Sequence, residues 1–199
     1  MEDTLKQLIT PRLLLRPFEE GDYPLILKIA ADPDTTRYLY YWARDGLTPE
    51  EDARRFLNYA LKNWARLPIR AREYCVTLRQ GGQAIGDGSI EWVENERGTA
   101  EIGWILLPEH RGKGYVTEMG RELLRVGFES LGAERIIAHC DARNAPSYRV
   151  MKRLGMRLEH IAPGARPAKA PGDVPGDEYT CAILRTEWAV RAQERKDIL

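Results

Sequence analysis

Apolar residues in the first third of the chain follow the spacing of one strand and two helices. Leu13 to Pro17 begins with three leucines and ends at proline, which predicts a short strand. Asp22 is placed to cap a first helix. Thr48 can cap a second helix, whose first residue is a proline and which has a carboxylate three residues after the cap. We expect this helix to run to about Ala65. Its apolar residues recur every three or four positions, which predicts one buried face: Ala53, Phe56, Leu57, Ala60, Leu61 and Trp64.

From Glu73 onward the pattern changes to short apolar runs separated by turns. Three of these runs predict strands: Tyr74 to Leu78, Gln83 to Val93 and Ala100 to Leu107. The first turn contains Gly81 and Gly82, and the second extends from Glu94 to Gly98. Because short turns join neighbouring strands, the sequence predicts a three-stranded antiparallel meander.

The rest of the chain alternates helices and strands. An apolar stripe predicts a helix from Val116 to Leu131, followed by a buried strand from Ile136 to Cys140. A short helix from Pro146 to Leu154 ends at Gly155 as its left-handed cap, and a last strand runs roughly from Tyr179 to Leu184. This order predicts a mixed α/β fold, in which a mixed sheet carries helices on its faces.

We expect one domain, residues 1–199, from the length of the chain. Between His160 and Asp177 the composition shifts to alanine, glycine, lysine and proline, which bury too little apolar surface to fold alone. The sequence therefore predicts a flexible Pro/Gly-rich loop over residues 162–177, and a loop that closes on substrate is the alternative.

Charge and cysteine usage exclude several classes of function. Thirty basic residues balance thirty acidic ones, so nothing favours nonspecific binding to nucleic acid or to a membrane surface. No apolar run approaches the roughly 20 residues that cross a bilayer, and we expect a cytoplasmic protein. Cys75, Cys140 and Cys181 lack the number and spacing of a disulfide framework or a metal site, so we interpret them as small core residues on strands.

Candidate chemistry is concentrated in the turn from Arg111 to Tyr115, between a strand and a helix. In this geometry several backbone N–H groups point at one spot and the helix dipole favours negative charge, which suits a diphosphate. Gly112 and Gly114 allow close approach to the backbone, while Arg111 and Lys113 add positive charge. Alternatively, so short a motif forms an ordinary solvated turn between the strand and the helix, with no role in phosphate binding.

The surrounding sequence resembles that of the GNAT acetyltransferases. Pro108 to Glu118 resembles their acetyl-CoA-binding loop, and it follows a typical strand that begins Ala100 to Trp104. Thr10 to Pro17 is similar to the N-terminal signature of the branch that includes the ribosomal-protein N-terminal (Rim-type) acetyltransferases. Asn144 to Met156 and Tyr179 to Trp188 are similar to later segments of that branch.

This resemblance implies the GNAT fold, a mostly antiparallel sheet whose fourth and fifth strands splay apart, with helices on both faces. Acetyl-CoA would lie in the splay as co-substrate, without a metal. The residues implied to bind it are Ile105, Leu106, Leu107, Arg111, Gly112, Lys113, Gly114, Tyr115, Val116, Thr117, Asn144 and Ser147. Glu109 departs from the family pattern, which usually has Gln or Arg there, and this weakens one contribution to the loop.

Acyl transfer to an amine requires a neutral amine, so a base is useful. Glu101 is the first candidate because it lies on the strand that lines the expected cleft, on the face opposite Ile102. Glu91 and Glu178 are weaker alternatives. An ordinary exposed strand carboxylate is the plain structural reading of Glu101.

The resemblance also suggests a proton donor for the departing thiolate. Many members of the family use a tyrosine seven residues after the asparagine, where this chain has Met151. A serine takes that part in the Rim-type branch, and Ser147 matches it. Binding of N–H groups in the first helical turn is the alternative role of Ser147. Tyr148 is a backup donor.

No role is predicted for His110, His139 or His160, because none has a partner at a recognisable spacing. Four aromatic residues lie in the region that forms the acceptor side in this family: Tyr38, Tyr40, Tyr41 and Trp42. They are interpreted either as packing residues or as a wall of the acceptor pocket.

The predicted function is transfer of acetyl from acetyl-CoA to a primary amine by direct attack in a ternary complex, with a protein N-terminal α-amine favoured. A small-molecule N-acetyltransferase of the aminoglycoside or polyamine type and a noncatalytic acyl-CoA-binding regulatory module are the alternatives. No motif encodes the acceptor. Whether the chain forms a homodimer is left open.

Overall fold

The computed structural model describes residues 5–39, 46–64, 70–168 and 173–196, with side chains described to residue 190. Its strands are β1 (Leu8–Ile9), β2 (Leu13–Pro17), β3 (Ala71–Leu78), β4 (Ala84–Trp92), β5 (Thr99–Leu106), β6 (Arg135–Asp141), β7 (Arg157–Arg166) and β8 (Gly176–Leu184). Its helices are α1 (Tyr23–Ala31), α2 (Pro33–Thr36), α3 (Pro49–Trp64), α4 (Tyr115–Arg125), α5 (Ala145–Leu154) and α6 (Arg185–Lys196). Three short helical turns complete the elements: η2 (Glu20–Asp22), η3 (Pro108–His110) and η4 (Val126–Ser130).

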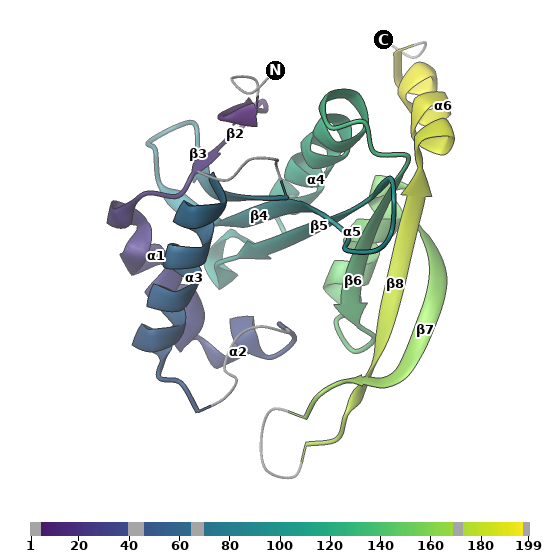
Figure 1. The fold of residues 1–199 in the computed structure, drawn as a ribbon. Coiled ribbons are helices and arrows are strands. Elements are labelled where there is room, and N and C mark those ends of the chain that lie inside the picture. The colour runs from purple at the N-terminus through teal and green to yellow at the C-terminus, as the bar shows by residue number, and fades with distance from the viewer. Residues whose placement is uncertain (1–4, 40–45, 65–69, 169–172, 197–199) are drawn as a thin grey trace.

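Within these residues the strands form one sheet in the order β1-β2-β3-β4-β5-β6-β8-β7 (Figure 1). Neighbouring strands run antiparallel except β5 and β6, which are parallel. The mixed α/β fold and the antiparallel meander of β3, β4 and β5 are thereby confirmed.

The sheet opens between β5 and β6. These strands pair only from Thr99 to Glu101 on one side and from Arg135 to Ile137 on the other, and beyond these residues they part. β5 continues to Leu106 and β6 to Asp141 without pairing to each other, as the resemblance implied.

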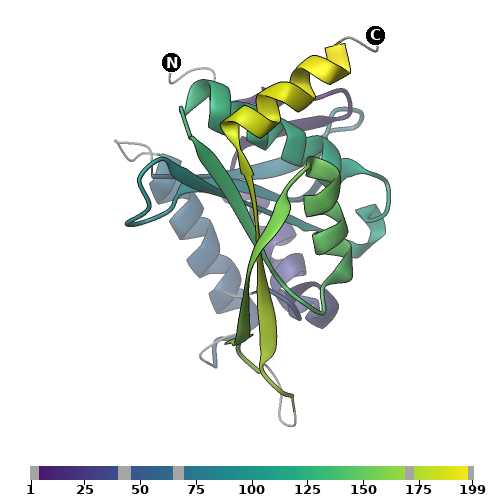
Figure 2. The same cartoon turned by 90° about the vertical axis from the view of Figure 1, so that its right-hand side faces the viewer.

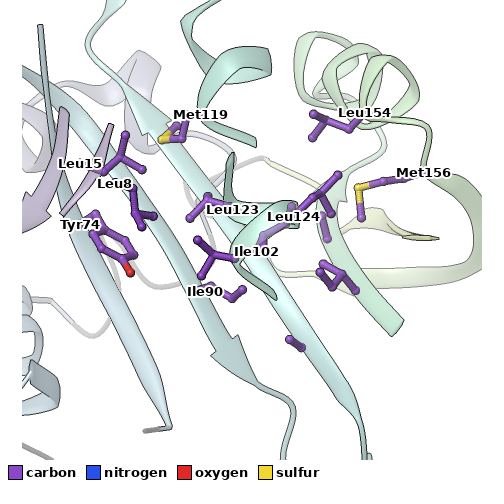
Figure 3. Packing of buried hydrophobic residues seen from close by; sticks show 14 of the residues in the cluster. Leu8, Leu15, Tyr74, Ile90, Ile102, Met119, Leu123, Leu124, Leu154 and Met156 are labelled. Carbon is purple, nitrogen blue, oxygen red and sulfur yellow. The ribbon is translucent and has the colours of Figure 1, made fainter. Parts of the chain in front are cut away.

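One face of the sheet is covered by α4 and α5, which contact each other and enclose the larger core. Met119, Leu123 and Leu124 point from α4 onto the sheet, where they meet residues such as Ile90 and Ile102 (Figure 3). Burial of such a continuous apolar stripe is the main stabilising contribution of this helix.

The opposite face is covered by α1 and α3, which pack side by side (Figure 1). Their apolar residues form a second core cluster that includes Cys75 of β3 and Leu107. Because side chains alternate along a strand, Glu73 lies on the same face of β3 as Cys75. This face therefore carries both a core cluster and charged residues of the site described below.

Several local sequence signals are confirmed. The Thr48 hydroxyl accepts a hydrogen bond from the Glu51 N–H at 3.2 Å, and the Glu51 carboxylate accepts one from the Thr48 N–H at 2.8 Å, which completes the predicted cap of α3. Gly155 closes α5 with a φ of 88°. Cys75, Cys140 and Cys181 are buried free thiols on β3, β6 and β8.

Asp22 is the N-cap residue of α1, as predicted, but its side chain does not cap the helix. Its carboxylate accepts a hydrogen bond from the Glu19 N–H and pairs with Arg16 at 2.7 Å, and it makes no cap contact with α1. The prediction that α3 runs to Ala65 falls at the border of the described residues, where α3 is described to Trp64.

The loop predicted over residues 162–177 is too long. β7 continues to Arg166 and β8 begins at Gly176, so both ends of the predicted loop belong to a long twisted hairpin (Figure 2). The error arose because proline and glycine at an edge strand resemble loop composition, although such a strand tolerates them at register shifts like that between Ala162 and Arg166. Helix α6 was also not predicted.

No helix in the described part of the chain is long and apolar enough to span a membrane.

Candidate active site

The opening between β5 and β6 contains a cavity of about 1360 Å³. β4, β5, the start of α4, β6 and α5 contribute its walls, and residues of α2 and α3 line it from the other side. The splay therefore places the loop at Arg111, the candidate base Glu101 and the candidate donor Ser147 around one space.

The loop before α4 presents a row of free backbone donors. The short turn η3 uses the Arg111 N–H, which donates to the Pro108 carbonyl at 3.1 Å, so this amide is not available as the sequence predicted. From Gly112 to Thr117 no backbone N–H donates to an acceptor in the described part of the chain. Gly112 and Gly114 have φ of 74° and 82°, a left-handed backbone that favours glycine. Such a nest at a helix N-terminus fits a diphosphate.

The two cationic side chains of the loop are placed differently from one another. Arg111 folds back and donates to the Leu106 carbonyl at 3.0 Å and to the Thr35 hydroxyl at 2.6 Å, while still lining the cavity. Lys113 does not line the cavity, and its carbonyl accepts a hydrogen bond from Arg12. The positive contribution of this loop thus lies mainly with Arg111.

The N-terminal segment holds the start of α4 in place. The Glu118 carboxylate accepts hydrogen bonds from the Thr10 hydroxyl at 2.6 Å and from Nε of Arg12 at 2.6 Å. The Arg12 guanidinium also lies 4.6 Å from the centre of the Tyr115 ring. The N-terminal signature of the sequence therefore has a structural purpose, because it fixes the helix end that carries the free amides.

Of the three residues implied to pair with the coenzyme, Ile105 and Leu106 of β5 line the cavity, and Leu107, which follows β5, does not. The Leu107 N–H donates to the Ile85 carbonyl, and its carbonyl accepts from the His110 N–H. Both polar groups of Leu107 are therefore already used within the chain.

At the other wall, Asn144 and Ser147 line the cavity at the start of α5. The Asn144 side chain caps the helix by accepting the Ser147 N–H at 3.3 Å, so the capping role falls to Asn144. The Ser147 hydroxyl makes no hydrogen bond to any described residue. Met151 is fully buried, and Tyr148 packs against Tyr179 outside the cavity lining, so neither reaches the site.

Glu101 lies where β5 and β6 part, and it lines the cavity together with other acidic residues. Glu91 of β4 is its register partner, and Glu178 of β8 approaches from beyond β6. The His139 ring lies between Glu101 and Glu178, with Nε2 3.7 Å from Glu101 and Nδ1 3.4 Å from Glu178. The Thr180 hydroxyl is 3.0 Å from the same Nδ1.

Burial and the neighbouring carboxylates Glu91 and Glu178 raise the pKa of Glu101 to about 7, against a smaller opposing effect of Arg166. Burial lowers the pKa of His139, so the imidazole favours its neutral form. A carboxyl group whose pKa lies near neutrality is suited to accept a proton at physiological pH.

The sequence and the fold agree with those of known proteins. A family model described as "Acetyltransferase (GNAT) domain" matches residues 12–157. The chain belongs to this GNAT acetyltransferase family. It is 36% identical over 181 residues to the uncharacterized N-acetyltransferase YnaD of Bacillus subtilis, covering 91% of this chain and 98% of the relative.

Solved structures of acetyltransferases share the fold of this chain. A GNAT-family acetyltransferase of Bacillus anthracis has a TM-score of 0.75 and 31% identity, covering 91% of this chain and 99% of the other. The spermidine N-acetyltransferase of Vibrio cholerae in complex with CoA and spermine has a TM-score of 0.72 and 20% identity, covering 89% and 98%.

Three features of this acetyltransferase site escaped sequence reasoning. His139 was given no role, although strand alternation puts it on the face opposite Cys140 and in register with Thr180. The pair Glu73 and Asp87 also lines the cavity. Glu73 lies two residues before the buried Cys75, so strand alternation would have placed both side chains on the same face of the strand. The third is the contact between the N-terminal segment and Glu118.

The acceptor side of the site is described in part. Tyr38 lines the cavity, whereas Tyr40, Tyr41 and Trp42 lie outside the described residues. Among the described residues, no three histidine, cysteine or carboxylate side chains are grouped to hold a metal ion.

Proposed function

We propose that this acetyltransferase moves acetyl from acetyl-CoA directly to a primary amine while both substrates occupy the cavity. The free N–H groups from Gly112 to Thr117 carry this proposal, because they form a diphosphate cradle next to a sheet opening that Glu101 lines. Glu101 lies five residues before Leu106 on β5, roughly 17 Å along the strand, which an extended pantetheine arm could follow.

The residues present fit acetyl-CoA. Its diphosphate would accept hydrogen bonds from the Gly112 to Thr117 amides beside the Arg111 guanidinium. Its arm would lie along the unpaired edge of β5 at Ile105 and Leu106, with Asn144 opposite. The bound thioester supplies the acetyl group. Leu107 and Lys113, which the resemblance included, are left out of the proposed contacts.

Glu101 acts as the base in the proposed reaction. Its carboxylate takes a proton from the ammonium form of the acceptor, directly or through one water. The neutral nitrogen then forms a bond to the thioester carbonyl carbon and gives its extra proton to a water. The carbon–sulfur bond breaks, and the thiolate takes a proton from the Ser147 hydroxyl, which regains one from that water. All three cysteines are buried and burial raises their thiol pKa, which supports direct transfer over an acyl-enzyme.

The proposed acceptor is a chemical class, the primary amines. The resemblance favoured a protein N-terminal α-amine, and the acidic lining of the cavity suits any positively charged amine, including a small one. Thiol release with N-terminal peptides, lysine peptides, polyamines and aminoglycosides separates these classes. A flat response across all of them would favour the noncatalytic acyl-CoA-binding module.

Acetyl-CoA is expected to stabilise the folded protein. At 100 times its Kd, binding to the native state alone adds about 2.7 kcal/mol to the free energy of unfolding, or roughly 5–10 °C in Tm for a chain of this size. Differential scanning fluorimetry over a concentration series measures this shift. Pantetheine, which lacks the diphosphate, is the control and should give a smaller shift. An unchanged Tm at millimolar acetyl-CoA would contradict the coenzyme site.

Replacing Ser147 with alanine is expected to lower kcat about 10-fold, because the thiolate then leaves without a positioned donor. The effect is modest since a thiol of ordinary pKa is a fair leaving group unaided. Asn144 still caps α5 in this variant, so Tm should not change. Steady-state thiol release measures kcat, and an unchanged kcat would remove Ser147 from the mechanism.

A further inference from the structure

A buried pair of carboxyl groups in the cavity has no part in the steps above. Glu73 of β3 and Asp87 of β4 each line the cavity, and each residue is only 6% exposed. The two carboxyl groups lie close enough for each to shift the pKa of the other, and a hydrogen bond between them requires that one of them holds a proton.

No cation of the described chain neutralises this pair. Lysines and arginines of the described residues form no ion pair with Glu73, Asp87 or the nearby Glu91. Arginines that line the cavity from α3 and β7 are held by other carboxylates: Arg55 by Asp52 at 2.6 Å and Arg166 by Glu178 at 2.8 Å. The wall formed by β3 and β4 is therefore acidic without internal compensation.

Burial is the largest cause of the raised pKa of both groups, about 7 for Asp87 and well above the usual range for Glu73. Glu91 and Glu101 raise the pKa of Glu73 further. Both shifts show that burial disfavours the ionised carboxylates, and a cation beside the pair would stabilise their ionised form.

A second observation also points to a ligand. The Oδ1 atom of Asp87 is buried and has no hydrogen-bond partner among the described residues. A buried carboxyl oxygen without a partner is costly, and buried polar atoms almost always have one. An ammonium group has three N–H donors and positive charge, so it would supply what this oxygen lacks.

We infer that Glu73 and Asp87 bind a second cationic nitrogen of the amine acceptor, so that the acceptor is a small diamine or polyamine. This inference rests on the proposed function, in which Glu101 marks the position of the reacting amine. The expected acceptors are small molecules with at least two cationic nitrogens. A peptide N-terminus as the better substrate would contradict the inference.

Strand register sets the spacing between the two proposed positions. Glu91 lies opposite Glu101, Glu73 lies opposite Ser89, and Asp87 lies four residues from Glu91 on β4. Two to four residues along a strand correspond to roughly 7–13 Å. A second cation at this distance requires a linker of several atoms, which alkyl diamines and triamines have.

The decisive experiment compares matched amines. We would measure kcat/KM at saturating acetyl-CoA for putrescine, cadaverine and spermidine, and for butylamine and pentylamine, which lack the second nitrogen. The diamines are expected to exceed the monoamines of equal chain length by about 10- to 100-fold, the range expected for a hydrogen bond to a charged group. The Asp87→Asn variant should lose this advantage while keeping its activity on monoamines.

Two further variants make the comparison specific. Glu73→Gln should behave like Asp87→Asn. Glu94→Gln is the control because Glu94 is an exposed carboxylate outside the cavity lining, with 82% of its side chain accessible. Putrescine binding in the presence of CoA is measured separately by thermal unfolding, so that folding and binding are assessed without turnover. Wild type should be stabilised by putrescine, and the two cavity variants should not.

Equal kcat/KM for diamines and monoamines would overturn the inference. So would an equal loss on both classes in Asp87→Asn, or a peptide N-terminus without a second cation as the better substrate. Absence of thiol release with every amine would contradict the proposed function instead. In that case the putrescine shift still decides whether the pair binds a cation, since its retention in both variants would reject the site.

Discussion

Replacing Glu101 with glutamine is expected to lower kcat by about 10²- to 10⁴-fold while leaving the affinity for acetyl-CoA unchanged. Glutamine has nearly the same shape but cannot accept the proton of an ammonium acceptor at neutral pH. Since the coenzyme contacts proposed for the loop after β5 do not involve Glu101, thermal stabilisation by acetyl-CoA should persist in this variant. Steady-state thiol release and fluorimetry provide the two measurements.

Glu91→Gln and Glu178→Gln are the matched controls because both carboxylates line the same cavity near Glu101. Each should lower kcat less than Glu101→Gln. A larger loss in either control would move the role of base to that residue, as the sequence allowed.

The same assignment predicts how the rate depends on pH. A base works in its ionised form, and the pKa of Glu101 is about 7, so kcat/KM should rise with pH and reach half its plateau near that value. Glu91 on β4 and Glu178 on β8 raise this pKa, and Arg166 on β7 lowers it. His139 on β6 also faces Glu101, with Nε2 at 3.7 Å. Glu101→Gln should abolish this rise, whereas a profile that stays the same in the variant would assign the titration elsewhere.

Replacing Gly114 with valine is expected to raise the KM for acetyl-CoA about 100-fold, corresponding to loss of one or two charge-assisted hydrogen bonds. Gly114 has a φ of 82°, which a β-branched residue does not adopt without strain, so the loop must rearrange and the free amides lose their common direction. Isothermal titration of acetyl-CoA checks the affinity directly.

Gly81→Val is the control for backbone strain. Gly81 has a φ of 85° in the turn between β3 and β4 and does not line the cavity. Both variants should lose stability, but only Gly114→Val should lose coenzyme affinity. Equal coenzyme affinity in the two variants would show that the amides of this loop do not grip the diphosphate.

The elements with strong local signals could be predicted from the sequence. The cap at Thr48, the glycine turn after β3 and the Gly155 helix end each depend on a few neighbouring residues, and each was found in its predicted place. β7 was not predicted because its residues pair with β8 across a register shift, a long-range feature that composition does not reveal. The side-chain partner of Asp22 was missed for a similar reason, since Arg16 comes from another element.

The site divides in the same way. Motif residues such as Gly112, Gly114 and Asn144 could be named as candidates because the family resemblance rests on consecutive positions, and all three line the cavity. His139 and Asp87 could not be recognised, because their significance depends on which strands are neighbours and on burial in a shared cavity. Only the fold brings these residues together, and it is the acceptor side that depends most on such contacts.

The joint between β5 and β6 contains only three residue pairs, so few backbone hydrogen bonds connect the two halves of the sheet, although one apolar core spans both. The first half supplies Glu73, Asp87 and Glu91, while the second leads into the helix that carries Asn144 and Ser147. The loop from Gly112 to Thr117 follows β5, so it belongs to the first half, while Asn144 belongs to the second. A coenzyme bound as proposed would therefore bridge the gap between the halves and clamp them together.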